Sequence, residues 1–215
     1  MKRRILIVLA ALIVMTGCTD TKKHSRGVYM LLDTSGTYAV ELRKAQSIIN
    51  YLLGVLQPGD TLAVARIDTG SFSEKDIIAK ATFDARPSIA NNQKRIFQKS
   101  IGEFVSSVTS SAYTDISGGV LQAIEYLNEA HPGEKYVLIF SDLKEDLAQG
   151  HIRDVPFLLS DFNVIALNVT KLRTDIRDPK QYLERVEAWR TKIEDGSGHW
   201  RVINDLERLD NIFSG

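Results

Sequence analysis

Short apolar runs alternate with longer amphipathic segments along most of this chain, a pattern typical of α/β proteins. Two runs are wholly apolar, Val28–Leu32 and Tyr136–Phe140, and each predicts a strand covered on both faces of a sheet. The second run belongs to a predicted strand at Lys135–Ser141. Further strands are predicted at Thr61–Ile67, at Ile77–Phe83 on an edge of the sheet, at Asn163–Val169 and at Trp200–Ile203.

The segments between these strands repeat their apolar residues at helical spacing. They predict helices at about Tyr38–Leu56, Asn91–Val108, Ile116–Ala130 and Pro179–Ile193, with a short helix at the end of the chain. Strands and helices alternate without a break in composition. We therefore expect one domain over residues 27–215, an α/β fold with a doubly wound, mostly parallel central sheet of about six strands flanked by helices.

The first 17 residues differ from the rest of the chain. Lys2, Arg3 and Arg4 precede an uncharged apolar run, Ile5–Met15, and small residues follow it. A membrane span needs about 20 apolar residues, and this run is shorter. This order predicts a secretory signal peptide over residues 1–17, with a plain N-terminal anchor helix as the alternative.

The junction Met15-Thr16-Gly17-Cys18 resembles a bacterial lipobox, with methionine where that motif most often has leucine. The resemblance implies that Cys18, the one cysteine of the chain, is lipidated and anchors the mature protein to a membrane. Residues 18–26 would then form a polar tether outside the cytoplasm. An aspartate directly after the lipidated cysteine would resemble an inner-membrane retention signal, but here Thr19 follows Cys18. The resemblance therefore implies the outer membrane, facing the periplasm, in a two-membrane bacterium.

Charge excludes one class of partner. The whole chain has 27 basic and 27 acidic residues, and removal of residues 1–17 takes three basic residues away, so 24 remain against 27 acids. The mature chain therefore has a small net negative charge and no long basic stripe. That composition argues against nucleic acid as a partner.

Oxygen-bearing side chains follow three predicted strand ends. Asp33, Ser35 and Thr37 come after the first strand, Thr114 opens a later helix, and Asp142 ends a central strand. Ligands of open α/β sheets bind at the carboxyl ends of the strands, and an all-oxygen set suits a hard cation such as Mg²⁺. Simple helix capping is the alternative for these residue types. We interpret Glu145 and Asp146, a few residues further on, as a solvated acidic loop, with contacts to a ligand as the alternative.

These residues resemble the metal-ion-dependent adhesion site of von Willebrand factor type A (VWA) domains. That site has the pattern D-x-S-x-S, then a threonine and an aspartate in two later loops, and here Thr37 replaces the final serine. The resemblance implies metal bonds from Ser35, Thr37 and Thr114, with Asp33 and Asp142 bound directly or through water. It also implies Mg²⁺, with Mn²⁺ or Ca²⁺ as substitutes, and a protein partner whose acidic side chain completes the coordination.

Two other functions stay open at this point. The stretch Asp33-Thr34-Ser35-Gly36-Thr37 is similar to the opening motif of haloacid dehalogenase-type phosphotransferases, in which Asp33 would be the nucleophile. Ser35 stands where that family has a second aspartate, and serine is a poor general acid at neutral pH. A metal-independent structural assembly subunit is the other alternative. We expect a binding protein rather than an enzyme.

Overall fold

The computed structural model describes residues 24–36, 38, 41–68, 70, 72–150 and 152–213. In this part of the chain, six strands form one sheet in the order β3-β2-β1-β4-β5-β6. The strands are β1 (Arg26–Asp33), β2 (Thr61–Ile67), β3 (Ile77–Thr82), β4 (Glu134–Phe140), β5 (Phe162–Leu167) and β6 (His199–Ile203). Only β3, at one edge, runs antiparallel to its neighbour. The expected α/β sheet is confirmed.

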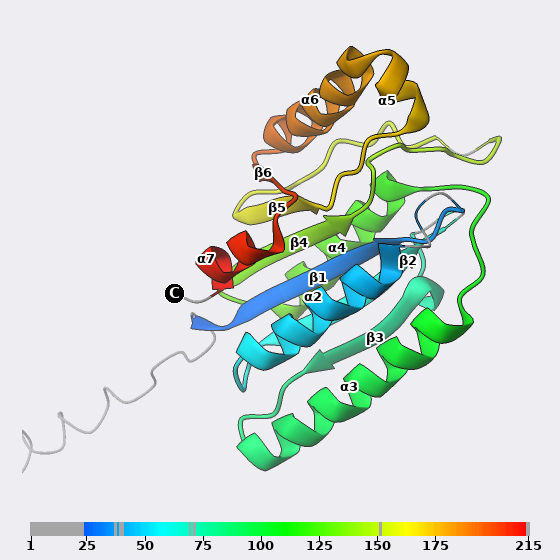
Figure 1. Ribbon diagram of the computed structural model, residues 1–215. Coiled ribbons are helices and arrows are strands. Elements are labelled where there is room, and N and C mark those ends of the chain that lie inside the picture. Colours follow the sequence, from blue (N-terminus) through cyan, green and yellow to red (C-terminus); the bar gives the residue numbers. More distant parts are fainter. Residues whose placement is uncertain are drawn as a thin grey trace, which may run out of the picture.

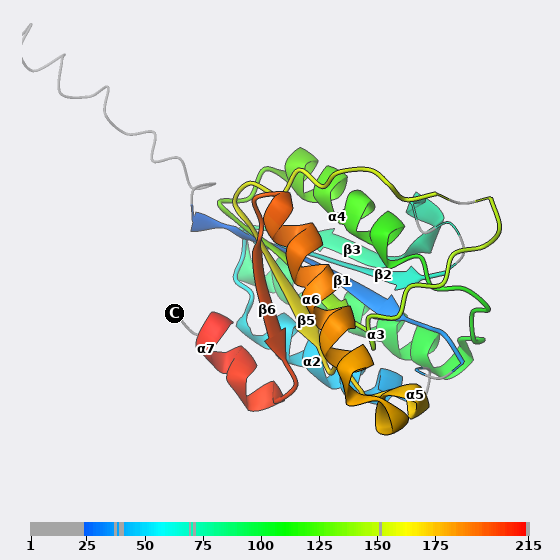
Figure 2. The same ribbon diagram turned by 90° about the horizontal axis from the view of Figure 1, so that it is seen from above.

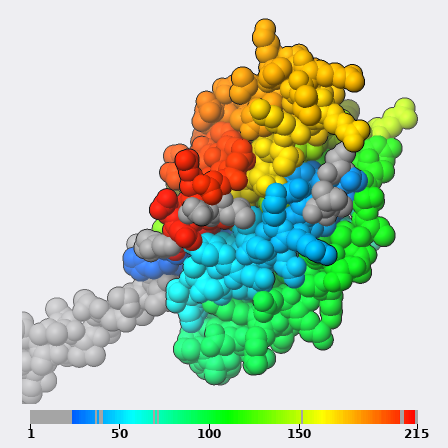
Figure 3. Space-filling view, in the orientation of Figure 1, coloured from blue at the N-terminus to red at the C-terminus, as the bar shows by residue number. Residues whose placement is uncertain are grey.

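Helices cover both faces of the sheet (Figures 1 and 2). They are α2 (Leu42–Val55), α3 (Pro87–Ser107), α4 (Ile116–Ala130), α5 (Arg173–Arg177), α6 (Pro179–Asp195) and α7 (Asp210–Phe213), with short 3₁₀ turns at η4 (Glu74–Asp76) and η5 (Leu206–Leu209). Figure 2 shows α4 on the side of the sheet opposite to α2 and α3. In the space-filling view, α2 and α3 lie against each other as one continuous layer (Figure 3).

The core is divided in two by the alternation of side chains along each strand. On β1, Val28, Met30 and Leu32 pack with α2, α3 and the end of the chain. Tyr29 and Leu31 point to the other face and belong to the second cluster, which includes residues of α4 and Trp189 of α6. Both faces of the sheet are covered at β1 and β4, so successive side chains along most of each strand are buried. This explains why the two strands contain the continuous apolar runs of the sequence.

The helix boundaries depart from expectation at two places. Helix α2 begins at Leu42 and not at Tyr38, whose hydroxyl donates to the carbonyl of Asn168 at 2.6 Å and whose ring packs edge-on against Phe140. Helix α3 begins four residues before the predicted Asn91, with Pro87 at a first-turn position. A proline there costs nothing, since the first helical N–H has no partner within the helix.

The predicted signal peptide and Cys18 lie outside the described residues, and so does Thr37. Among the helices that are described, none has the length and apolar character needed to cross a bilayer. The expected lipid anchor therefore remains a prediction.

Candidate functional site

Asp33 stands at the carboxyl end of β1 and joins that end to β4. Its side chain is 1% exposed. One carboxylate oxygen accepts from the backbone N–H of Ser35 at 2.8 Å, and the other accepts from the Ser141 hydroxyl at 2.7 Å. The first bond closes a turn of the kind that aspartate favours after a strand. Asp33 is therefore fixed in orientation by two uncharged donors.

The loop before α4 lies against this turn. The Ser111 N–H donates to the carbonyl of Thr34 at 2.9 Å, which places that loop beside the residues that follow β1. Thr114, with 4% of its surface exposed, pairs with Asp146 through two backbone hydrogen bonds of 2.7 and 3.0 Å. Three connections, distant in sequence, are thus tied together at the carboxyl end of the sheet.

Asp142 lies in the third connection and is 3% exposed. One of its carboxylate oxygens accepts from the N–H of Lys144 at 2.8 Å, and its backbone carbonyl accepts from Nε of Arg185 at 2.8 Å. Burial raises the pKa of Asp142 above its ordinary value, and the nearby charge of Asp33 raises this pKa further. The Lys144 N–H and the charges of Arg185 and Lys144 oppose that rise.

The residue after Asp142 has an unusual backbone conformation. Leu143 is 1% exposed and has φ of 65°, in the left-handed region that bulky residues rarely occupy. Its N–H donates to the Ser141 hydroxyl at 3.0 Å, and its carbonyl accepts from the indole of Trp189 at 3.0 Å. Strain of this kind persists only where the surroundings impose it, and it concentrates at functional sites.

The two buried carboxylates form no ion pair within the described residues. Among the described residues, no lysine or arginine forms a salt bridge with Asp33 or Asp142. A buried charge is costly unless it is paired or coordinates a metal. The described side chains also contain no cluster of three or more His, Cys, Asp or Glu residues fit to hold a metal. The predicted set is of another kind, since it combines two carboxylates with hydroxyls.

The structure brings most of the predicted residues to one edge of the sheet. Asp33 and Ser35 share a turn, Thr114 lies in the adjoining loop, and Asp142 follows the strand paired with β1. Thr37 is the predicted ligand that the described residues do not include.

Sequence reasoning missed the residues that support the site. Ser141 bonds to Asp33, and Arg185 holds the Asp142 carbonyl. The interpretation of Glu145 as part of a solvated loop is wrong, because its carboxylate accepts from the N–H and the hydroxyl of Ser117 at 2.6 and 3.0 Å. An acidic residue at a helix N-terminus is electrostatically favoured, but nothing local marks Glu145 as reaching a helix 28 residues away.

The sheet order and the two helix layers define a VWA-like α/β fold. A von Willebrand factor type A protein from Catenulispora acidiphila matches with a TM-score of 0.53 and 13% identity, over 88% of this chain and 41% of that one. The pilus adhesin SpaC of Lactobacillus rhamnosus GG, in its open conformation, matches with a TM-score of 0.54 and 8% identity, over 89% of this chain and 29% of that one. The chain thus spans less than half of either protein.

No protein-family model matches the sequence, and no curated protein matches it significantly. At such low identities the structural likeness shows the fold alone.

Proposed function

We propose that this protein is a membrane-anchored, extracytoplasmic binding domain that captures a protein partner through Mg²⁺ held at the strand ends. Asp33, Ser35, Thr37, Thr114 and Asp142 would hold the ion. The observation that carries the proposal is the pair of buried carboxylates, 1% and 3% exposed, with which no lysine or arginine of the described residues forms a salt bridge. They lie where the three connections meet.

The donor chemistry fits Mg²⁺. This ion takes oxygen ligands in near-octahedral geometry and keeps several waters, so it is bound by few carboxylates. When bound, it would supply a strongly electrophilic centre on which an acidic side chain of the partner completes the coordination. Mn²⁺ and Ca²⁺ accept the same oxygen donors and are the natural substitutes.

Exposed apolar side chains in the connections at the carboxyl edge of the sheet support a protein as the partner. Phe72, Tyr113, Ile152 and Ile176 are 51%, 37%, 79% and 75% exposed. They come from the connections after β2, before α4, after β4 and after β5, all of which begin or end near the carboxyl edge of the sheet. Protein interfaces combine such apolar residues with a few central polar contacts. SpaC, which shares the fold, is described as a pilus adhesin.

The direction of β1 supports the proposed anchoring. The strand begins at Arg26 and ends at Asp33, so eight residues, about 26 Å of extended strand, separate its start from the site (Figure 1). A lipid on Cys18 would hold the domain by the opposite end, with the metal site facing away from the bilayer. Replacement of Cys18 by serine should release the protein from the membrane fraction; retention of an uncleaved precursor there would instead indicate an anchor helix.

Thermal unfolding of the full chain in detergent, with and without metal, tests the site. At a Mg²⁺ or Mn²⁺ concentration about 100 times Kd, we expect a gain of about 2.7 kcal/mol in the free energy of unfolding. For a domain of this size the gain corresponds to a rise in Tm of about 5–10 °C. Asp33→Ala should abolish the rise, whereas Asp154→Ala, which removes an exposed carboxylate from the connection after β4, should preserve it.

A wild-type protein that is folded but insensitive to metal would contradict the metal site and favour the structural subunit. Turnover of a generic phosphate ester would favour the phosphotransferase. In that reaction Asp33 would have to attack as a nucleophile, yet both of its oxygens accept hydrogen bonds.

A further inference from the structure

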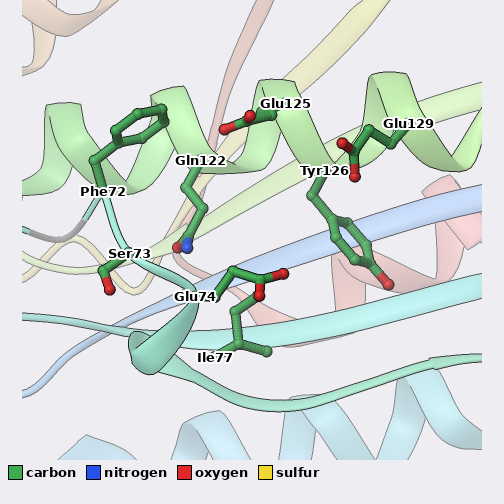
Figure 4. Close-up of a pocket in the computed structure, with 8 residues that line it drawn as sticks. All are labelled: Phe72, Ser73, Glu74, Ile77, Gln122, Glu125, Tyr126 and Glu129. Atoms are coloured by element: carbon green, nitrogen blue, oxygen red, sulfur yellow. The ribbon is translucent and has the colours of Figure 1, made fainter.

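A cavity of about 330 Å³ lies between α4 and the connection from β2 to β3, on the flank of the sheet. Its apolar walls are Phe72, Ile77 and Tyr126. Figure 4 shows Gln122 and Tyr126 reaching from α4 toward the side that carries Ile77. The cavity is also lined by three glutamates, Glu74, Glu125 and Glu129.

The charge of this lining is mostly uncompensated. The Lys80 ammonium lies 2.9 Å from the Glu74 carboxylate. In the described part of the chain, neither Glu125 nor Glu129 forms a salt bridge. Glu125 and Glu129 are exposed, so two negative charges remain at the solvent side of the cavity, within reach of a cation that lies against its apolar wall.

The Tyr126 ring is held in place and already has a cation nearby. It packs edge-on against Tyr29, with ring centroids 5.5 Å apart and an interplanar angle of 63°. The Lys80 ammonium lies 5.9 Å from the centroid of the Tyr126 ring. An aromatic face within this distance attracts ammonium and guanidinium groups. The cavity thus combines an aromatic surface with carboxylates, the features that favour a cationic ligand with an apolar stem.

Gln122 adds a hydrogen-bond donor to the wall of the cavity. This side chain is 6% exposed, and its Oε1 accepts from the Tyr29 hydroxyl at 2.8 Å. Burial raises the pKa of Tyr29 above its ordinary value, so the hydroxyl remains a donor at neutral pH. Within the described residues, the Gln122 Nε2 donates to no protein acceptor and is open to solvent. A backbone carbonyl of a bound peptide would supply one.

We propose that this cavity binds a basic segment of a protein partner. An arginine or lysine side chain lies against Tyr126 and is neutralised by Glu125 and Glu129, and a backbone carbonyl of the segment accepts from Gln122. Phe72, half exposed beside the cavity, covers the stem of the basic side chain. This binding needs no metal, so it is independent of the proposed metal site and extends the contact with a partner along α4.

Fluorescence anisotropy of a labelled, end-blocked triarginine peptide tests the proposal on the full chain in detergent, at low salt and with a chelator present. We expect saturable binding that weakens as salt is added. An end-blocked triglutamate peptide should not bind. The chelator removes any bound metal, so the peptide experiment does not depend on the metal site. Peptide binding can therefore be observed even if metal does not raise Tm, and metal can raise Tm even if the peptide does not bind.

Two matched charge variants separate a built site from overall charge. Glu125→Gln/Glu129→Gln should weaken peptide binding about tenfold, since it removes the two unpaired charges. Glu184→Gln/Glu194→Gln removes the same charge from exposed positions of α6 and should change affinity less than about twofold. Equal weakening by both variants would overturn the proposal. Circular dichroism confirms that each variant is folded.

Three further measurements identify the ligand chemistry. Lys80→Gln should tighten binding, because the competing ammonium is gone, and Phe72→Ala should weaken it. Spermidine carries three amines but no peptide carbonyl and should displace the peptide poorly. Displacement by equimolar spermidine would show a site for bare cations and would overturn the assignment of a peptide segment.

Discussion

Among the described residues, four aspartates that are at most 3% exposed lie around the carboxyl end of the sheet, and they differ in how their charge is balanced. Asp115 and Asp175 are each 1% exposed, and each lies 2.7 Å from an arginine, Arg153 and Arg185 respectively. Asp115 also caps α4 by accepting from the N–H of Gly118. These two carboxylates are neutralised by the chain itself.

Asp33 and Asp142 are equally buried, but the donors that reach their carboxylates are backbone N–H groups and one hydroxyl. An arginine is near enough to contact this region, since Nε of Arg185 donates to the Asp142 backbone carbonyl while its terminal nitrogens bind Asp175. The absence of an ion pair at Asp142 is therefore not explained by a lack of a nearby arginine. Under the proposed function, Asp33 and Asp142 are the two carboxylates that a cation from outside the chain would neutralise.

The largest expected effect is that of breaking an internal pair. Asp175→Asn leaves the mostly buried Arg185 without its carboxylate and should lower the free energy of unfolding by about 3 kcal/mol. Urea unfolding measures the loss. In the double variant Asp175→Asn/Arg185→Met both charges are absent, so it should be more stable than the single variant. If Asp175→Asn were as stable as the wild type, the proposed difference between the arginine-paired aspartates and the two aspartates without an ion pair would be wrong.

Acid should weaken the same pair. The Arg185 guanidinium holds the pKa of Asp175 below its ordinary value, so the unfolded chain takes up a proton at higher pH than the folded chain. The stabilisation is complete above the unfolded pKa of about 3.9 and is lost as pH falls through the folded pKa. Urea unfolding from pH 7 to pH 3 should show the gap between wild type and Asp175→Asn closing at the acid end. A gap that stays constant would contradict this linkage.

Removal of an unpaired charge should have a smaller effect. Asp33→Asn keeps an acceptor for the Ser35 N–H and offers Nδ2 to the Ser141 hydroxyl. In chelator, its free energy of unfolding should stay within about 1 kcal/mol of wild type, because one hydrogen bond is exchanged for another and a buried charge is gone. Addition of Mg²⁺ should then separate wild type from the variant in Tm. Destabilisation as large as that of Asp175→Asn would instead give Asp33 a structural role.

Much of the fold was predictable because each central strand is a local signal. The apolar runs at Val28–Leu32 and Tyr136–Phe140 needed no knowledge of the rest of the chain, and β2 has the predicted bounds, Thr61–Ile67. The start of α2 was not predictable, because Tyr38 is held by Asn168, 130 residues away.

The positions of the candidate site residues were predictable in part for the same reason. Asp33, Ser35 and Asp142 sit at strand ends that the pattern marks, whereas their supports act over long separations. Ser141 reaches Asp33 across 108 residues, and Arg185 reaches Asp142 across 43. Nothing in the local sequence distinguishes these two residues from other serines and arginines.

The smallest effect is expected at the surface, where a strong pair should shift a pKa but not stability. Arg86 binds Asp84 through two hydrogen bonds of 2.8 and 2.9 Å and lowers the pKa of Asp84 to about 2. In Arg86→Ala, NMR titration should show the pKa of Asp84 rising toward its ordinary value, while Tm stays unchanged because water and salt screen the exposed pair. A clear fall in Tm in Arg86→Ala would mean that burial does not explain why the Asp115 and Asp175 ion pairs should stabilise the fold more than surface pairs do.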